Sequence, residues 1–198
     1  MAKVLIDLVR QKFPNAVIET HAAHGDDTIV LEAASWHAVA QFLRDDPRAN
    51  MQMLVDLTVV DYPDRDPRFE VVAHLLSLSK GHRVRIKTRV GDPEGDSARV
   101  DTLADLWGSA NWAAREAYDM FGVVFVGHPD LRRILMYPEF EGYPLRKDYP
   151  AEKIQPLVEY RDVPNIEKLP PFGPDEGMSF GRQTHARGRV APDEVESN

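Results

Sequence analysis

The chain has 198 residues, no cysteine and a formal net charge of −8. The absence of cysteine excludes disulfide bonds, thiolate metal sites, cysteine-ligated iron–sulfur clusters and a thiol nucleophile. The negative charge argues against general nucleic-acid binding, which depends on excess lysine and arginine, and no apolar run is long enough to cross a bilayer. The length favours one domain with an appendage.

The first part of the chain predicts two helices on either side of a β-hairpin. Apolar residues recur with helical spacing over residues 4–13, and Pro14 ends the pattern. Short β-prone runs at 16–20 and 28–32 are separated by turn-forming residues, which is typical of a hairpin. Ser35 is a candidate N-cap for the second helix. The apolar residues of that helix share one side, and they are Trp36, Val39, Ala40 and Leu43.

Three longer β-type segments follow, at 51–62, 69–79 and 82–90. In the third segment, side chains suited to a core alternate with four basic ones. One face of this strand should therefore pack on helices, while the other faces water or a partner. The basic residues are Arg83, Arg85, Lys87 and Arg89. They could also grip nucleic acid, but no aromatic residue lies among them to stack on bases, so a solvated or protein-facing sheet is the favoured interpretation.

A helical turn at 102–107 and a second helix up to Phe121 are predicted next, with Ser109 or Asn111 as the N-cap and Gly122 as the terminator. Ten of the fifteen prolines come after this helix, so no long helix or strand is expected there. The whole pattern predicts an α/β fold of the α+β type over residues 1–150, in which helices pack on a mainly antiparallel sheet. Residues 151–198 should form an extended, proline-rich C-terminal arm that becomes ordered on a partner.

The cluster that most resembles a metal site consists of His21, His24, Asp26 and Asp27. Imidazole and carboxylate are ordinary ligands of zinc or manganese, so a stand-alone metal-dependent hydrolase is one alternative. However, a hairpin turn does not hold the two histidines on one face, and an exposed turn is favoured. Glycine-rich nucleotide loops and a GxSxG motif are both absent from the sequence.

The helix up to Phe121 carries two stripes of side chains with helical spacing, which suggests that it is covered on more than one side. Arg115 and Asp119 are spaced for an i,i+4 ion pair. Glu116 and Asp119 could serve as paired acid–base carboxylates, but no histidine or nucleophile accompanies them on the helix. We therefore predict no catalytic, cofactor-binding or metal-binding residue in this chain.

The run from 112 to 150 is interpreted instead as a contact surface for another protein. It interleaves large apolar residues with arginines and carboxylates, the combination of anchors and charges that specific interfaces use. We expect its cations to pair with acidic groups of a partner; the alternative is that they tie the segment to its own domain. The candidate interface residues are Trp112, Arg115, Glu116, Asp119, His128, Asp130, Arg132, Arg133, Arg146, Lys147 and Asp148.

Two motifs in this run resemble a known family. They read AREAYDMFGVVFVGHPDLRRIL from residue 114 and EGYPLRKDYP from residue 141. Both are similar to the signature region of the thirty-kilodalton subunit of respiratory complex I, the NADH:quinone oxidoreductase. A looser likeness covers roughly residues 50–150. The sequence departs from the family pattern at Ala114, where glutamate is usual, and at Tyr143, where histidine is common.

This resemblance implies a non-catalytic structural subunit of the peripheral arm of a proton-translocating enzyme. Such a subunit packs against the quinone-site subunit and lies near iron–sulfur subunits. It holds no cofactor, because NADH, FMN, iron–sulfur clusters and quinone belong to the partner subunits. The expected location is the cytoplasmic face of the bacterial inner membrane, as a peripheral protein held through its partners and without nucleic acid. An alternative is the equivalent subunit of a related membrane-bound hydrogenase or of another quinone-linked dehydrogenase.

Overall fold

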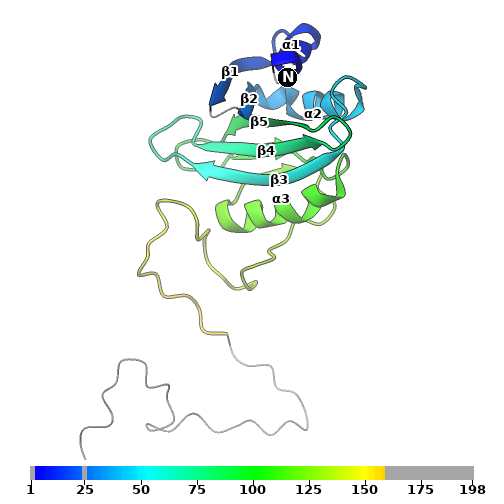
Figure 1. Ribbon diagram of the computed structural model, residues 1–198. Helices are drawn as coiled ribbons and strands as arrows, with labels where there is room; N and C mark the ends of the chain where they lie inside the picture. The colour runs from blue at the N-terminus through cyan, green and yellow to red at the C-terminus, as the bar shows by residue number, and fades with distance from the viewer. Residues whose placement is uncertain (1–2, 24–25, 159–198) are drawn as a thin grey trace, which may run out of the picture. The chain divides into compact units, whose positions relative to one another are not determined.

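The computed structural model describes residues 3–23 and 26–158, which belong to one compact unit that ends at Val158 (Figure 1). His24 of the candidate metal cluster lies outside the described residues. So do residues 159–198 of the predicted arm, of which only 151–158 are described. The predicted boundary at residue 150 therefore stays a prediction.

The described residues form a mixed α/β fold, as the sequence predicted. The helical elements are α1 (Lys3–Lys12), the short 3₁₀ turn η1 (Ala33–Ser35), α2 (Trp36–Asp45) and α3 (Gly108–Phe121). The strands are β1 (Val17–Ala23), β2 (Asp26–Leu31), β3 (Met53–Asp61), β4 (Phe69–Ser77), β5 (His82–Val90), β6 (Arg99–Asp101) and β7 (Val124–Val126). None of the described helices is both long enough and apolar enough to pass through a membrane.

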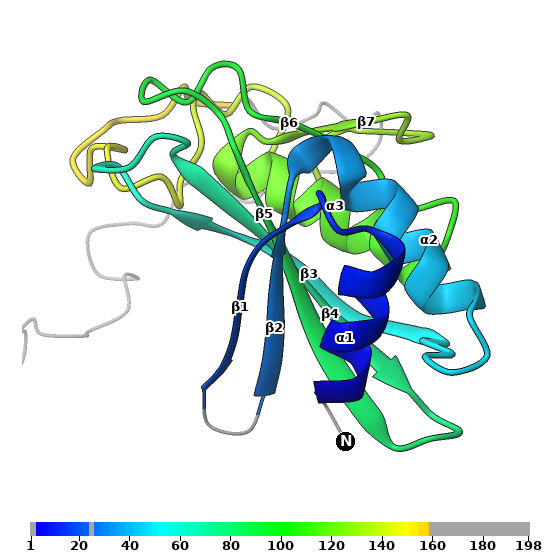
Figure 2. The same ribbon diagram turned by 90° about the horizontal axis from the view of Figure 1, so that it is seen from above.

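Five strands form the main sheet in the order β1-β2-β5-β4-β3. The β1–β2, β5–β4 and β4–β3 pairs are antiparallel, and β2–β5 is the one parallel pair within this sheet. Helices α1, α2 and α3 lie on the same side of the sheet (Figure 2). The other face of the sheet therefore has none of these three helices over it.

The core lies between the sheet and the three helices. Trp36 of α2 is fully buried there, and the indole Nε1 of Trp107 donates a hydrogen bond to the carbonyl of Met51 at 3.2 Å. Burial on β5 alternates as predicted, because Val84, Ile86, Thr88 and Val90 are buried and the basic residues between them are not. Packing of these apolar faces is the main source of stability in a domain of this size.

Several local predictions were wrong. Strands β6 and β7 pair in parallel as a separate small sheet, which the sequence did not predict because three-residue strands carry too short a pattern. Helix α3 begins earlier than expected, with Trp107 as its N-cap, while Ser109 Oγ donates instead to the carbonyl of Leu54 at 2.9 Å. Asp26 and Asp27 belong to β2 and His21 to β1, so the predicted turn is shorter than expected.

Candidate protein interface

The segment 127–158 contains no helix or strand; its first part passes below α3, and its last part extends away from the helix (Figure 1, yellow-green to yellow). An irregular chain must find partners for its backbone groups. One of these bonds runs from the backbone N–H of Leu145 to the carbonyl of Met120, at 3.1 Å. Two buried carboxylates, on Asp119 and Asp61, provide further fixed points.

Asp119 anchors the first half of the segment. Its Oδ2 accepts three successive backbone N–H groups, from Ile134 at 3.0 Å and from Leu135 and Met136 at 2.8 Å each. Its Oδ1 accepts the Arg133 guanidinium at 2.8 Å. Burial alone would raise the pKa of Asp119, but these donors outweigh it and the pKa lies below its ordinary value. The carboxylate therefore stays ionised and holds the loop on α3.

This geometry shows that the predicted ion pair between Arg115 and Asp119 is wrong. Arg115 donates instead to the backbone carbonyls of Arg132 and Arg133, both at 3.1 Å, and its guanidinium lies 5.2 Å from the ring centroid of Trp112. The Asp119 side chain is completely buried, so the donors that reach it are those of the covering loop. The stripe of α3 that carries Arg115 and Asp119 is therefore covered only at these two residues, by this chain's own segment, while Trp112 and Glu116 of the same stripe are exposed.

Asp61 anchors the second half, together with Arg68, and sequence reasoning missed both residues. The guanidinium of Arg68 makes a two-pronged contact with the Asp61 carboxylate, at 2.7 and 2.9 Å. Asp61 also accepts the backbone N–H of Lys147 at 2.8 Å, and Arg68 reaches Asp148 at 2.9 Å. The sequence did hold one indication of this pair: Asp61 ends an apolar strand, and an aspartate that is buried there must be paired.

The guanidinium of Arg146 also binds groups of its own chain. It donates to the carbonyl of Phe121 at 2.6 Å and to that of Gly95 at 2.9 Å, and it lies over the ring of Tyr143, 4.5 Å from the centroid. Tyr143 is one of the two departures from the family pattern. Its ring thus contacts Arg146, which binds the carbonyl of the last residue of α3. Gly122 has φ of 80°, and a Cβ there would come within 2.6 Å of Tyr143 and Arg146. Only glycine allows this close approach.

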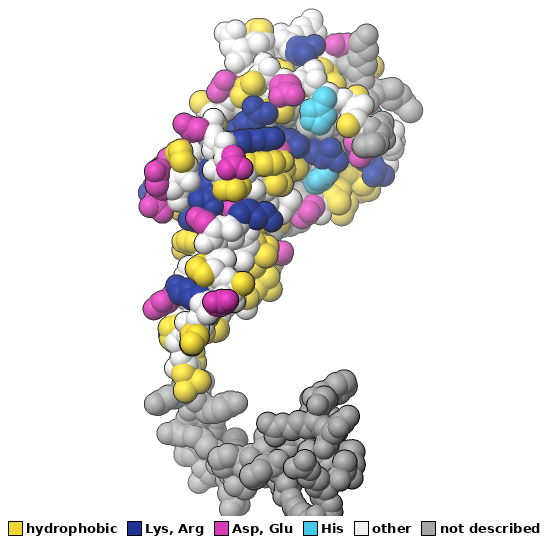
Figure 3. Space-filling view, turned by 90° about the vertical axis from the view of Figure 1, so that its left-hand side faces the viewer, with side chains coloured by type: hydrophobic (Ala, Val, Ile, Leu, Met, Phe, Trp, Pro, Cys, Tyr) yellow, Lys and Arg dark blue, Asp and Glu magenta, His cyan; other side chains and the backbone are white. Residues whose placement is uncertain are grey.

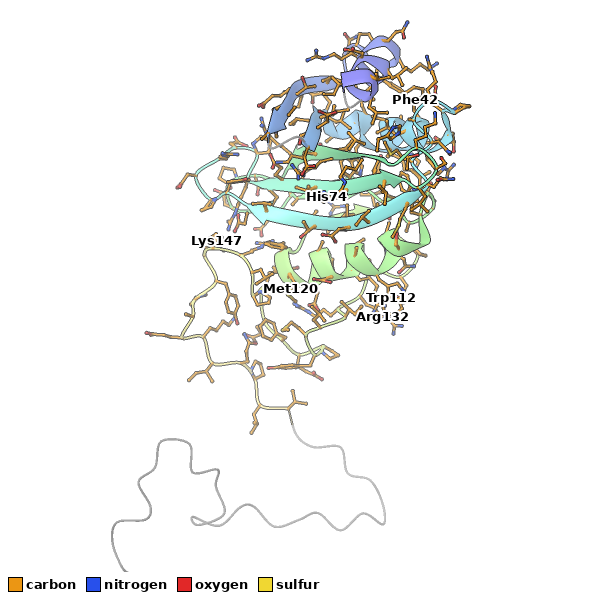
Figure 4. The ribbon with its side chains drawn as sticks, in the orientation of Figure 1. Phe42, His74, Trp112, Met120, Arg132 and Lys147 are labelled. Carbon is orange, nitrogen blue, oxygen red and sulfur yellow. The ribbon has the colours of Figure 1, made fainter. Side chains whose placement is uncertain are left out.

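The remaining candidate residues lie nearer the surface. His128 Nε2 donates to the carbonyl of Asn111 at 3.0 Å, and its Nδ1 accepts the backbone N–H of Asp130 at 3.1 Å. Arg132 forms an exposed ion pair with Asp130 at 2.9 Å. Three more side chains are exposed: those of Trp112, Glu116 and Lys147. Trp112 and Arg132 lie at one end of α3, and Lys147 lies beyond the other end (Figure 4).

The contacts of Arg133 and Arg146 favour the alternative in which these cations tie the segment to its own domain. A guanidinium whose donors are already taken by a buried carboxylate, as in Arg133, or by backbone carbonyls, as in Arg146, has little left to offer a partner. The interface role of the eleven candidates stays a prediction, and the exposed ones are now its best members.

Exposed apolar side chains give the segment its own means of contact. Ile154 is 92% exposed, Leu157 is 94% exposed and Trp112 is 63% exposed. The backbone around Ile154 and Leu157 is held through Gln155, which bonds to both the N–H and the carbonyl of Glu141, at 2.9 and 3.1 Å, and also to the hydroxyl of Tyr149. Apolar groups that are held in position and left in water are typical of protein contact sites.

The structure does not support the other two candidate sites, the metal cluster and the basic strand β5. Within residues 3–23 and 26–158 there is no group of three or more histidine, aspartate or glutamate residues that could hold a metal ion. On β5, Lys87 pairs with Glu70 at 2.7 Å and Arg89 with Glu19 at 3.2 Å. The basic strand is therefore largely neutralised by its neighbours, which removes the reason to expect a nucleic-acid site there.

The fold is shared with chains of respiratory complexes. A solved structure described as Nqo5, trypsin-resistant fragment 1–134, matches 65% of this chain and 98% of its own chain, with a TM-score of 0.53 and 31% sequence identity. A chain of an archaeal respiratory membrane complex, the membrane-bound sulfane sulfur reductase, matches 84% of this chain and 98% of its own. Its TM-score is 0.64 at 24% identity, which shows a common fold.

The pattern of the family described as "Respiratory-chain NADH dehydrogenase, 30 Kd subunit" matches residues 29–155, and the chain belongs to this family. Subunits of bacterial NADH-quinone oxidoreductases are similar to it over most of their length. The one from Ruegeria sp. (strain TM1040) is 38% identical over 91% of this chain and 94% of its own length. The one from Geotalea uraniireducens (strain Rf4) is 41% identical over 73% of this chain and 85% of its own length.

The resemblance noted in the sequence is therefore confirmed. The relatives are subunits of a multi-subunit enzyme, the NADH-quinone oxidoreductase. Membership of this family implies that the partners of the chain are other subunits of such an enzyme.

Proposed function

We propose that this chain is a non-catalytic structural subunit of the peripheral arm of a proton-translocating NADH:quinone oxidoreductase, and that it packs against the quinone-site subunit. Family membership supports the assignment to this enzyme. In this proposal NADH, FMN, iron–sulfur clusters and quinone are bound by other subunits. The chain reaches the cytoplasmic face of the bacterial inner membrane only through those partners.

The contact with the quinone-site subunit is proposed to use Trp112 and the segment up to Val158. The observation that carries it is the pair Ile154 and Leu157, which are almost fully exposed on a backbone that Gln155 and Tyr137 hold in place. A backbone that is already held in place loses less conformational entropy when a partner covers it. Burial of the two aliphatic groups then contributes roughly 1.5–3 kcal/mol each to association.

The test is purification of the tagged full chain from membranes of a bacterium that depends on it. We expect iron–sulfur, flavin and quinone-site subunits to co-purify with the native sequence, and far less with the double variant Ile154→Asp/Leu157→Asp. The matched control is Val4→Asp/Ile18→Asp, which places two charges at exposed apolar positions of α1 and β1. A double variant in the segment that retains the full set of subunits and normal NADH:quinone activity contradicts the proposed contact.

The same purification also tests the alternative that the chain is the equivalent subunit of a related membrane-bound complex. The fold alone does not distinguish them, because the sulfane sulfur reductase chain has it too. Co-purification of flavin and NADH-oxidising subunits supports the NADH enzyme. Co-purification of hydrogenase subunits instead contradicts it.

A further inference from the structure

Two stretches of the segment 127–158 lie side by side and are held together by hydrogen bonds. Gln155 bonds to the backbone N–H and carbonyl of Glu141, at 2.9 and 3.1 Å. The hydroxyl of Tyr137 donates to the carbonyl of Pro156 at 3.2 Å. Together the two stretches form what we call the anchor surface, which consists of residues 137–141 and 152–157.

The anchor surface combines apolar and acidic side chains. Ile154 is 92% exposed and Leu157 is 94% exposed. Glu139 and Glu152 belong to the same two stretches and are exposed as well. Neither glutamate forms an ion pair or a side-chain hydrogen bond with any residue that the structure describes. Figure 3 shows apolar side chains together with acidic and basic ones at the narrow lower end of the described residues.

The cation of the anchor surface is already engaged. The surface contains three glutamates and one lysine, Lys153. The ammonium of Lys153 lies 3.4 Å from the carboxylate of Glu141 and donates to the carbonyl of the same residue at 3.3 Å. Lys147 is an exposed cation outside this surface, and it has Asp148 as its neighbour in the chain. The charges that the anchor surface offers to a partner are therefore the carboxylates of Glu139 and Glu152.

This chemistry restricts what can cover Ile154 and Leu157. Glu139 and Glu152 would repel an acidic protein surface, a bilayer of anionic lipids or a nucleic acid. A wholly apolar surface would remove the two carboxylates from water without a counter-charge, which is costly. A protein surface with an apolar centre and cations at its rim pairs with both kinds of group.

We propose that the anchor surface docks on a basic patch of a neighbouring subunit, where an apolar recess receives Ile154 and Leu157. Lysine or arginine side chains at the rim of that recess pair with Glu139 and Glu152. The proposal rests on the function proposed above and specifies the chemistry of the partner at that contact. The apolar groups supply affinity, while the charges select the partner and its register.

The polarity of this contact is opposite to the one that the sequence led us to expect. The density of arginines in the run from 112 to 150 suggested an acidic partner. However, Arg133 binds the carboxylate of Asp119, and Arg146 binds backbone carbonyls. The free charges at the anchor surface are consequently negative.

The charge reversal Glu139→Lys/Glu152→Lys in the tagged full chain tests this polarity. We expect the recovery of the neighbouring subunit in the membrane purification to fall about tenfold or more, because like charges then face each other. The neutral variant Glu139→Gln/Glu152→Gln should lower it about threefold, as for the loss of exposed ion pairs. The matched control Asp7→Lys/Asp101→Lys makes the same change in charge at exposed positions of α1 and β6 and should recover every subunit.

Salt dependence separates an electrostatic role from a structural one. Recovery with the native chain should decline as the salt concentration rises, and recovery with the glutamine variant should decline less. All the variants should melt within a few degrees of the native chain, because the replaced side chains are exposed. If the reversed chain recovers every subunit, or if the glutamine variant recovers more than the native chain, the basic patch is wrong and the general function stands. If the native chain recovers no subunit, both proposals fail.

A bilayer is the other surface that an exposed aliphatic pair could meet. Flotation of the full chain with vesicles of phosphatidylcholine, and separately of phosphatidylglycerol, should leave the chain unbound. Binding to either vesicle that Ile154→Asp/Leu157→Asp removes would overturn the proposal, because the anchor surface would then belong to a membrane.

Discussion

The carboxylate of Asp119 and the guanidinium of Arg133 are joined at 2.8 Å across the junction between α3 and the segment that follows it. The same carboxylate accepts three consecutive backbone N–H groups of that segment. A helix side chain thus determines the path of an irregular chain fourteen or more residues further on. The position of the first half of the segment 127–158 therefore depends on the buried charge of Asp119.

Replacing this charge should release the segment. Asp119→Ala leaves three N–H groups and a guanidinium without their acceptor, and we expect a loss of about 3–5 kcal/mol in the free energy of unfolding. Urea denaturation followed by circular dichroism measures this. Limited trypsin digestion should cut the variant early near Arg132 and Arg133. The exposed variant Glu116→Ala, on the same helix, is the control and should unfold within about 0.5 kcal/mol of the native chain.

The stability of the domain should fall in acid through the same group. The pKa of Asp119 in the folded chain lies below its ordinary value of 3.8, so the folded state binds fewer protons than the unfolded one. The stabilisation is therefore complete above the ordinary value and is lost as the pH falls below 3.8 through the folded pKa. Unfolding free energies measured from neutral pH down into this acid range should decline less steeply for Asp119→Asn. Identical slopes would count against this linkage.

The pair Asp61 and Arg68 should show strong coupling. Arg68 is 3% exposed, and its replacement by methionine leaves the buried Asp61 carboxylate without its main counter-charge. We expect Arg68→Met to cost about 3–5 kcal/mol of unfolding free energy. The double variant Arg68→Met/Asp61→Leu should recover much of this loss, because it removes the unpaired charge as well. A double-mutant cycle measures the coupling, and strictly additive effects would contradict it.

Gly122 provides a test of the close approach at the end of α3. Gly122→Ala must adopt a positive φ and also push against Tyr143 and Arg146, so we expect a loss of about 2–4 kcal/mol. Gly81→Ala is the matched control: its φ of +64° is also left-handed, but no atom lies within 4 Å of the added Cβ. That variant should lose only about 1 kcal/mol. Equal losses would show that the contact with Tyr143 is unimportant.

Much of the fold follows from local patterns in the chain. The helices before Pro14 and after Ser35, the three long strands and the terminating role of Gly122 were all predictable, because side-chain periodicity reports directly on which face is buried. The short strands β6 and β7 and the N-cap at Trp107 were not predictable. Three residues carry no measurable period, and a cap without a side-chain hydrogen bond carries no signature.

The sequence indicated where the candidate site lies, but it did not predict the contacts inside the site. The run after Trp112 was singled out for its mixture of anchors and charges, and the family resemblance followed from its motifs. The partners of individual charges were misjudged, since spacing suggested Arg115 for Asp119 whereas the structure pairs Asp119 with Arg133. Helical spacing brings side chains within reach, but burial decides which donor a carboxylate receives.

The sequence by itself determined that this chain has no thiol chemistry, that it carries helices on a mainly antiparallel sheet, and that it belongs to the complex I thirty-kilodalton family. These properties depend on composition, on local periodicity and on contiguous motifs. Only the tertiary structure decided that Asp61 and Asp119 clamp the contact segment from residues up to 86 positions away. Such pairings depend on which backbone and charged groups are removed from water together, and no local pattern in the chain records that.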